Sequence, residues 1–269
     1  MSLKATGILK GIINDRKMIF SLAKNDFKTK YAGSYLGIVW AFVQPIVTVL
    51  VYWFVFQVAF HSQPVDDFPF VLWLIAGLVP WFFFQDSWNG GTQAFVDYSY
   101  LVKKVVFNIS IIPLVKVISA LFVHMAFLAF MLVIYMGYGN MPNLYWLQIP
   151  YYTLALFFLA LALSYITSSL LVFFRDLSQI ITIILQVGVW LTPIMWNVNS
   201  LGLPKPVKIV IMLNPLYYIV NGYRESLIYK TAFFENMGMT IYFWAVVAVL
   251  MVLGLWMFGK LRIHFADVL

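Results

Sequence analysis

The chain has 269 residues, of which 63% are hydrophobic and 10% are charged, and its mean hydropathy is +0.91. Soluble domains average about 45–50% apolar and about 25% charged residues, so this composition excludes a water-soluble fold and predicts an integral membrane protein. The lack of cysteine excludes disulfides, thiolate zinc sites and cysteine nucleophiles, and the formal charge of +7 calls for no nucleic-acid partner, because in a membrane protein the distribution of Lys and Arg matters more than their sum.

Residues 1–35 are expected to form a cytoplasmic tail and an amphipathic interface helix, with no cleavable signal peptide. Within 14–34 the apolar side chains share one helical face, and they are Met18, Ile19, Leu22, Ala23 and Phe27. Lys17, Lys24 and Lys28 lie on the opposite face, where they would meet anionic headgroups. Asp26 and Lys30 interrupt the apolar face. The helix is predicted to anchor the chain to lipid or to offer a docking surface to a cytoplasmic protein.

Six segments are long and apolar enough to cross a bilayer, since a crossing helix needs about 20 mainly apolar residues. They are 36–60, 70–93, 109–136, 148–174, 177–197 and 239–259. Pro45 and Pro80 fall inside the first two, where neighbouring helices can satisfy the carbonyls that proline frees. The expected fold class is an all-α integral membrane protein with a single transmembrane domain over 36–269.

The distribution of Lys and Arg predicts that both termini are cytoplasmic. Basic residues cluster ahead of the first span, occur as Lys103 and Lys104 between spans two and three, and return after span six. The segment between the first two spans has Asp66 and Asp67 and neither Lys nor Arg, and the segment between spans three and four has no charge. Basic loops therefore alternate with loops that lack basic residues, as a helix bundle with cytoplasmic ends requires.

Arg175 and Asp176 fall at the tight turn between spans four and five, on the cytoplasmic side. An isolated Arg or Asp at the middle of a bilayer costs roughly 2.5–3.5 kcal/mol, and a place at the turn avoids most of this penalty. The pair is either an anchor, with Asp176 capping the next helix, or part of the inner mouth of a pathway.

Two further connections are predicted to be more than simple turns. Residues 97–108 form a short amphipathic segment, either a plain loop or a small helix pressed into a partner. Ahead of the last span a helix begins after Asn214–Pro215, with Pro in its first turn. Its apolar face consists of Leu216, Ile219, Val220, Tyr223 and Leu227, and its polar side is expected to carry Arg224 and Glu225. Residues 199–234 would form an outer re-entrant hairpin or a helix that lies flat on the outer leaflet.

No catalytic or metal site is expected. Residues 254–260 match most of the G-x-x-x-x-G-K phosphate loop, but Leu261 replaces its Ser or Thr and the stretch ends a membrane helix. The three histidines are dispersed, and no Ser/His/Asp set or acidic pair has the spacing of a hydrolase. Asp86 and Lys116 are the charged candidates within the spans, too few for an ion-coupled carrier. Any transport would therefore draw its energy from another protein.

Aromatic residues are abundant, with 25 Phe, 16 Tyr and 10 Trp. At the ends of spans such residues are ordinary interfacial anchors. As a set they could also line a pathway, because aromatic faces contact the C–H faces of sugars without demanding one pose. The candidates are Trp40, Phe42, Tyr52, Trp53, Phe56, Trp73, Trp190 and Trp196.

The order of these elements resembles the permease subunit of type-2 ABC exporters for polysaccharides. The resemblance covers essentially the whole chain and includes "YLGIVWAFVQPIVTVLVYWFVF", "VFFRDLSQI", "NPLYYIVNGYRESLIY" and "FADVL". The "VYWFVF" and "FADVL" segments are most similar to the wall teichoic acid translocation permeases of Gram-positive bacteria.

The resemblance implies a homodimer in the bacterial cytoplasmic membrane, bound to two copies of a separate ATPase that carries Mg-ATP. The substrate would be an anionic glycan polymer linked to undecaprenyl diphosphate. Residues 97–108 would be the coupling helix, the interface helix would add to that contact, and 199–234 would gate the outer mouth.

The resemblance also implies roles for individual residues. Those in coupling are Arg16, Lys17, Lys24, Lys28, Asp97, Tyr98, Lys103, Lys104 and Asn108. Those at the outer gate are Asn214, Pro215, Tyr217, Tyr218, Tyr223, Arg224 and Glu225. The inner mouth would contain Lys116, Arg175 and Asp176, and the basic residues there, with Lys103 and Lys104, would attract the phosphates of teichoic acid.

Three alternatives stay open. The first is an exporter for O-antigen, capsule or another lipid-linked glycan. The second is a membrane enzyme that uses a lipid-linked donor, which should carry an acidic or histidine cluster in an outer loop, where this chain has only Glu225 and Glu235. The third is a structural or adaptor protein that would co-purify with no ATPase.

Overall fold

A computed structural model describes residues 15–61, 68–103, 108–198 and 202–269. Within these ranges every secondary-structure element is helical, as predicted. The long helices are α3 (Trp40–Trp53, continued by the π-helix η2, Phe54–Ala59), α4 (Phe70–Thr92), α7 (Ile112–Gly137), α8 (Ile149–Leu171), α9 (Leu177–Leu191) and α12 (Met237–Leu261). The short ones are α2 (Arg16–Lys30), η1 (Gly37–Val39), α5 (Ala94–Asp97), α6 (Ser99–Val102), η3 (Ile109–Ile111), η4 (Leu144–Gln148), α10 (Lys205–Met212), α11 (Pro215–Arg224, continued by the π-helix η5, Glu225–Tyr229), η6 (Arg262–His264) and α13 (Phe265–Val268).

Five helical stretches of the described chain are long and apolar enough to cross a membrane. They are Gly37–Ala59, Phe70–Thr92, Ile109–Gly137, Leu144–Leu171 and Met237–Val268. These correspond to five of the six predicted spans, with ends shifted by up to a few residues at most boundaries. The remaining predicted span is α9, which is apolar but only 15 residues long.

The prediction that this helix continues to residue 197 is wrong. Thr192 has an extended backbone, with φ −78° and ψ 130°, and it precedes Pro193, whose ring disfavours the helical conformation in the residue before it. At about 1.5 Å per residue, α9 is about 22 Å long, against about 30 Å for the hydrocarbon core of a bilayer. Residues 192–195 are buried in protein, where irregular backbone is tolerated at membrane depth.

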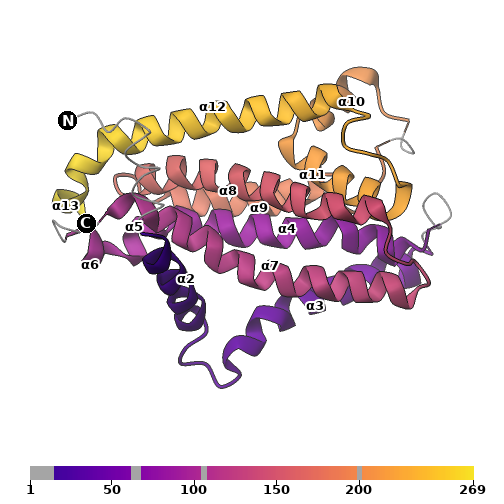
Figure 1. The fold of residues 1–269 in the computed structure, drawn as a ribbon, viewed down its shortest axis with the longest axis horizontal. Helices are drawn as coiled ribbons and strands as arrows, with labels where there is room; N and C mark the ends of the chain where they lie inside the picture. The colour runs from indigo at the N-terminus through magenta and orange to yellow at the C-terminus, as the bar shows by residue number, and fades with distance from the viewer. Residues whose placement is uncertain (1–14, 62–67, 104–107, 199–201) are drawn as a thin grey trace.

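Helix α4 is the centre of the bundle. It packs on α7, α8 and α11, and nearly all of its residues from Leu72 to Phe84 are buried. Protein surrounds this part of the helix on most sides, and its sequence from Leu72 to Phe84 accordingly has no polar residue. Helix α12 packs on the outside of α8, while α3 is mostly exposed and flanks α4 at the edge (Figure 1).

Helix α2 lies at a steep angle to the long helices and packs on α7 (Figure 1). Ile19 and Ala23 are buried in this contact, whereas Met18, assigned to the same apolar face, is exposed. The interface helix is therefore shorter than the predicted 14–34, and the face that it buries is narrower.

The segment predicted to follow the second span forms α5 and α6, which start at Ala94 rather than at residue 97. The C-terminal helix α13 packs against them, with the ring centroids of Phe95 and Phe265 4.9 Å apart. These elements lie at one end of the bundle, which we call the α5 end (Figure 1). Lys104 and its neighbours up to residue 107, together with Asp66 and Asp67, lie outside the described residues.

Helices α10 and α11 lie toward the other end of the bundle (Figure 1). The predicted start of the second helix is confirmed: Asn214 is the N-cap of α11, and its side chain accepts a hydrogen bond from the Leu216 backbone N–H at 3.0 Å. The expectation that Arg224 faces a polar side is wrong, because its side chain is 4% exposed and lies inside the bundle. Residues 199–201, where the predicted hairpin begins, lie outside the described residues.

Candidate functional site

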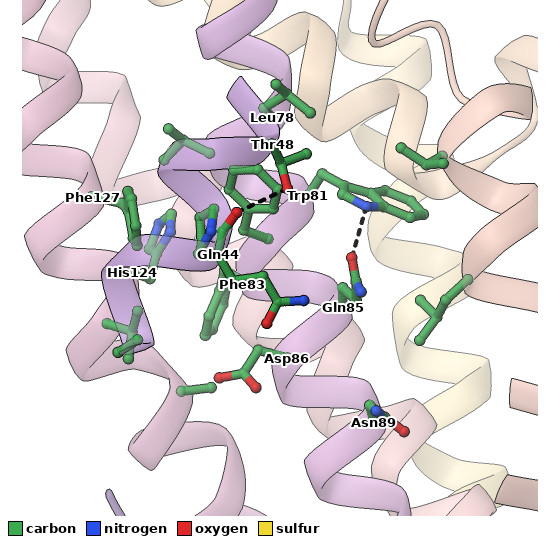
Figure 2. A pocket seen from close by; sticks show the side chains of 18 of the residues that line it. Gln44, Thr48, Leu78, Trp81, Phe83, Gln85, Asp86, Asn89, His124 and Phe127 are labelled. Carbon is green, nitrogen blue, oxygen red and sulfur yellow. Dashed lines mark hydrogen bonds between the residues drawn. The ribbon is translucent and has the colours of Figure 1, made fainter. Parts of the chain in front are cut away.

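A cavity of about 800 Å³ opens between α3, α4, α7 and α9. Three of the predicted pathway aromatics line it, Trp40, Tyr52 and Trp190, and α4 adds Trp81 and Phe83. Figure 2 shows Gln85, Asp86 and Asn89 following Trp81 along α4, opposite Gln44 and Thr48 of α3. The wall therefore combines rings with hydrogen-bonding side chains, most of which are uncharged.

A second cavity, of about 600 Å³, continues the first. The two share the lining residues Lys30, Asp86, Asn89, Ala120 and Thr182. The second cavity is bounded by α2, α4, α5, α7 and α9, and its other polar side chains include Asn25, Gln93, Ser178 and Gln179. Together the cavities form one groove, which is aromatic between the long helices and polar beside α2.

The groove carries no excess of positive charge. Its charged lining residues are two lysines, Lys30 and Lys116, and three aspartates, Asp26, Asp86 and Asp97. Lys30 of α2 forms an ion pair with Asp86 of α4. Burial alone would lower the pKa of Lys30, but the Asp86 carboxylate more than compensates and raises it, so this ammonium stays charged.

Lys116, predicted at an inner mouth as a cation for phosphate, lines the groove but is already paired. Its ammonium lies 2.7 Å from Asp26 and 2.8 Å from Asp97, and its side chain is only 13% exposed. A lysine held between two carboxylates is not free to attract an anion. Arg175 and Asp176 are exposed at the turn between α8 and α9, and the Asp176 side chain makes no capping hydrogen bond to α9.

The predicted coupling residues divide into two groups. In the first group the Tyr98 hydroxyl donates to Asp26 of α2 at 3.0 Å, the Asn108 amide donates to the N-cap Asp15 at 3.2 Å, and Asp97 pairs with Lys116 of α7. Burial, and then the Asp26 carboxylate, raise the pKa of Tyr98, so it remains a donor. The second group is exposed and consists of Arg16, Lys17, Lys24, Lys28 and Lys103.

Sequence reasoning missed the acidic partners on and beside α2. Asp15 and Asp26 receive the contacts from the 94–108 segment, although the prediction named only basic residues on this helix. The position of Asp26 within the apolar face of α2 could have indicated this contact. A carboxylate at that position needs a cationic partner in the bundle, and Lys116 is the lysine within span three.

The other predicted aromatics do not line the groove. Phe42 packs on Phe127 with ring centroids 5.5 Å apart, and Phe56 packs on Phe70 at 5.6 Å. Trp53 is exposed, and the Trp196 indole donates to the backbone carbonyl of Trp190 at 2.9 Å. Phe42, Phe56 and Trp196 therefore contact neighbouring residues of the bundle, and Trp53 lies on its surface.

The eighth predicted aromatic, Trp73, lies under Arg224, whose guanidinium carbon is 3.3 Å from the ring centroid. The guanidinium donates to the backbone carbonyls of Pro193 and Ile194, both at 2.7 Å. At the start of the same helix the Asn214 amide donates to the Thr192 hydroxyl at 3.0 Å. Both ends of α11 are thus fastened to the irregular segment that follows α9.

The remaining residues of the predicted outer gate join polar contacts within the bundle. The hydroxyls of Tyr218 and Thr240 lie 3.0 Å apart, and the Tyr223 hydroxyl lies 2.7 Å from that of Thr153 and 3.1 Å from His124 Nε2. His124 also lines the groove (Figure 2), so this network joins the groove to α11.

Glu225 follows Arg224 and accepts a hydrogen bond from the Asn221 amide at 2.6 Å. Burial raises the pKa of its carboxyl to about 7. Pro215 occupies the first turn of α11, and Tyr217 is partly buried. These contacts therefore hold α11 in place, and the pKa of Glu225 lies near neutral pH.

Comparison with known proteins gives concordant matches. The sequence profile described as ABC-2 type transporter matches residues 17–228. The chain is 30% identical over 217 residues to the "O-antigen export system permease protein RfbA" of Myxococcus xanthus, with 81% of this chain and 82% of the relative covered. It is 28% identical over 253 residues to a protein of the same description from Klebsiella pneumoniae, with 94% of this chain and 95% of that relative covered.

Proposed function

Because the chain belongs to the ABC-2 type transporter family, we propose that it is the permease subunit of an ATP-driven polysaccharide exporter. It is a multi-pass protein of the cytoplasmic membrane. The energy would come from a separate ATPase subunit that binds Mg-ATP, since family membership implies such a partner. The relatives are described as O-antigen export permeases, and we extend polysaccharide export to this chain.

The groove is the observation that carries the proposal. It runs between membrane helices, and its wall offers rings and neutral amides such as Gln44, Gln85 and Gln186. Rings pack on the apolar faces of sugars, and amides exchange hydrogen bonds with hydroxyls, so a glycan can slide along the wall without one tight pose. In this proposal the α5 end is cytoplasmic and the hairpin that contains α10 and α11 gates the outer mouth.

A homodimer would complete the pathway. Helices α3 and α9 flank the groove and expose large apolar side chains, among them Leu50, Val51, Ile183, Ile184 and Trp190. A second copy of the chain facing these helices would convert an open groove into a channel shielded from lipid. Helices α2, α5 and α6 would dock the ATPase, with the exposed basic residues of α2 at that contact.

The charge of the groove favours an uncharged glycan backbone as cargo. Two lysines face three aspartates along it, and a polyanion would gain no attraction there. Teichoic acid is the second candidate, supported by the "VYWFVF" and "FADVL" segments. The substrate would enter linked to undecaprenyl diphosphate in both cases.

The test is transport by the purified complex of this chain and its ATPase in inside-out vesicles. The two probes are an undecaprenyl-diphosphate-linked mannan and an undecaprenyl-diphosphate-linked poly(glycerol phosphate) of similar length. We expect ATP-dependent uptake of the mannan, and none when the chain is present without the ATPase or with an ATPase that cannot hydrolyse ATP. Preferred uptake of the polyanion would reverse the choice of cargo, and uptake driven by the permease alone would refute the proposal.

A further inference from the structure

Lys116 joins three elements that come from different parts of the sequence. It stands near the start of α7, and its ammonium binds Asp26 of α2 at 2.7 Å and Asp97 of α5 at 2.8 Å. The Tyr98 hydroxyl donates to the same Asp26 at 3.0 Å, and the Tyr98 ring centroid lies 5.2 Å from the ammonium. We call Asp26, Asp97, Tyr98 and Lys116 the Lys116 cluster.

The cluster has two carboxylates and one cation, so within it the lysine is the sole counter-ion for both acids. Both carboxylates bind the same nitrogen atom, so they lie close to each other. The side chains of Lys116 and Asp26 are only 13% and 11% exposed, so water screens this pair poorly, whereas the side chain of Asp97 is 47% exposed and its charge is screened more. Without the ammonium, α2 and α5 would present like charges to each other, and an attraction would become a repulsion.

Polar contacts also fasten the two ends of α2. Asp15, its N-cap, accepts from the Asn108 amide at 3.2 Å, and Lys30, its last residue, pairs with Asp86 of α4. The helix buries Ile19 and Ala23, and Phe20 and Phe27 pack on Phe122 of α7 with ring centroids 5.6 and 6.1 Å apart. These apolar contacts hold α2 on α7, whereas the Lys116 cluster is the contact that joins α2, α5 and α7.

We infer that Lys116 is a positioning residue that makes α2 and α5 move as one body and carries their movement into α7. The inference rests on the proposed function, in which an ATPase pushes on α2, α5 and α6 while α7 borders the groove. Such a residue leaves ATP hydrolysis and binding of the ATPase intact but determines how much glycan moves for each ATP.

The main test is the Lys116→Met variant of the whole permease–ATPase complex, with the undecaprenyl-diphosphate-linked mannan as probe. Methionine keeps much of the apolar stem and removes the charge. We expect ATP hydrolysis to stay within about twofold of wild type, while mannan moved per ATP falls about tenfold, the ratio that corresponds to about 1.4 kcal/mol. Lys116→Arg is the matched control and should keep the wild-type ratio.

A rescue separates charge from packing. Adding Asp97→Asn to Lys116→Met removes the repulsion between α5 and α2, so mannan moved per ATP should recover by several-fold over the single variant. A role in packing alone would give no recovery, because the amide does not refill the space of the lysine. If Lys116→Met does not assemble, Asp26→Asn, which removes the α2 arm of the cluster, takes its place with the same expected loss.

A second readout does not depend on transport. Since the chain has no cysteine, spin labels at Ser21→Cys and Val96→Cys, two exposed positions, report the distance between α2 and α5. This distance should be equal in the nucleotide-free and ATP-bound complexes, and should broaden or shift between them in Lys116→Met. Unchanged label distances and an unchanged mannan-to-ATP ratio in that variant would overturn the inference. A wild-type complex that moves no glycan would instead refute the proposed function, and the label distances would still decide this inference.

Discussion

Arg224 is a buried cation that joins α11 to the segment following α9. Its guanidinium satisfies the carbonyls of Pro193 and Ile194, two acceptors that the end of α9 leaves without helical partners. It also covers the face of Trp73, which is 2% exposed. The cation thus stabilises an irregular segment that the membrane interior would otherwise disfavour.

Arg224→Met should lower the thermal stability of the purified protein more than any exposed substitution in the same hairpin. Two buried carbonyls would lose their donor, and each unsatisfied group costs about 1–3 kcal/mol. The thermal stability of Arg224→Lys should lie between those of Arg224→Met and wild type, because an ammonium can reach one carbonyl but cannot bind two with the fixed geometry of a guanidinium. Lys230→Ala, at an exposed position, is the control, and thermal unfolding in detergent is the measurement. An Arg224→Met protein as stable as the control would show that these bonds contribute little.

Glu225 should make stability depend on pH. Its pKa in the folded protein is about 7, above the usual value near 4.5, because burial disfavours the carboxylate, and Asn221, Tyr152 and Glu235 are the polar groups around it. The folded state therefore binds the proton more tightly, so stability present at pH 5 is lost progressively as the pH rises through 7.

The check is the unfolding temperature between pH 5 and pH 8 for wild type, Glu225→Gln and Glu235→Gln. Glutamine at 225 should flatten the curve. The same change at Glu235, whose charge raises the pKa of Glu225 less than burial does, should flatten the curve only slightly. Equal slopes in all three proteins would rule out this assignment.

At the scale of helices, small residues determine how closely α8 and α12 pack. A Cβ atom at Gly254 would lie 2.9 Å from Tyr165 Cβ and 3.0 Å from the Ala162 carbonyl oxygen, whereas one at Gly259 would meet nothing within 4 Å. Both glycines belong to the stretch that resembles a phosphate loop by its letters. Gly254 instead lies in the contact with α8, and Gly259 is exposed. Close approach through small residues is a common basis of helix association in membranes.

Gly254→Val should therefore push α12 from α8 and lower the unfolding temperature by several degrees. Gly259→Val, on the same helix, should leave it within experimental error. The pair is matched in residue type and in helix, so the comparison isolates the contact with Ala162 and Tyr165. Similar losses in both variants would mean that the lower helix propensity of valine, rather than the contact, is responsible.

The sequence predicts helices well wherever an apolar run is long. The spans around α4, α7, α8 and α12 are recovered to within a few residues because about 20 apolar residues admit no other structure in lipid. The end of α9 is missed because hydropathy does not register the preference of Thr192 for an extended backbone before Pro193. Arg224 is misplaced because an isolated charge in a sequence predicts a surface residue. Its buried acceptors, the carbonyls of Pro193 and Ile194, are distant in sequence and form no local pattern with it.

At the scale of the whole molecule, the same limit holds for the groove. Three of the eight predicted aromatics line it. The abundance of aromatic residues does not predict which of them do so, because tertiary packing determines whether a ring on α3 or α9 faces lipid, a neighbouring helix or the groove. The link between Lys116 and Asp26 joins residues 90 positions apart, and no local pattern encodes such a pairing.

The proposed homodimer gives a direct prediction. Ile184 is exposed on α9 beside the groove, while Val249 is exposed on α12 at the outside of the bundle. In native membranes, Ile184→Cys should cross-link to a second copy with a short bifunctional reagent, producing a species of twice 31.0 kDa. Val249→Cys should not. Cross-linking at Val249 alone would place the interface on the other side of the bundle and leave the groove open to lipid.

The shortness of α9 has a consequence for the surrounding lipid. A helix of about 22 Å against hydrocarbon of about 30 Å creates hydrophobic mismatch, and a bilayer commonly responds by thinning beside the short element. Lipid tails at the edge of the proposed dimer interface, where α9 meets the bilayer, would then be locally compressed, and a headgroup would have less hydrocarbon to cross there than elsewhere. The rate of glycan transport should accordingly be higher in vesicles made from lipids with shorter acyl chains. It should be lower in vesicles whose acyl chains are longer than those of the native membrane.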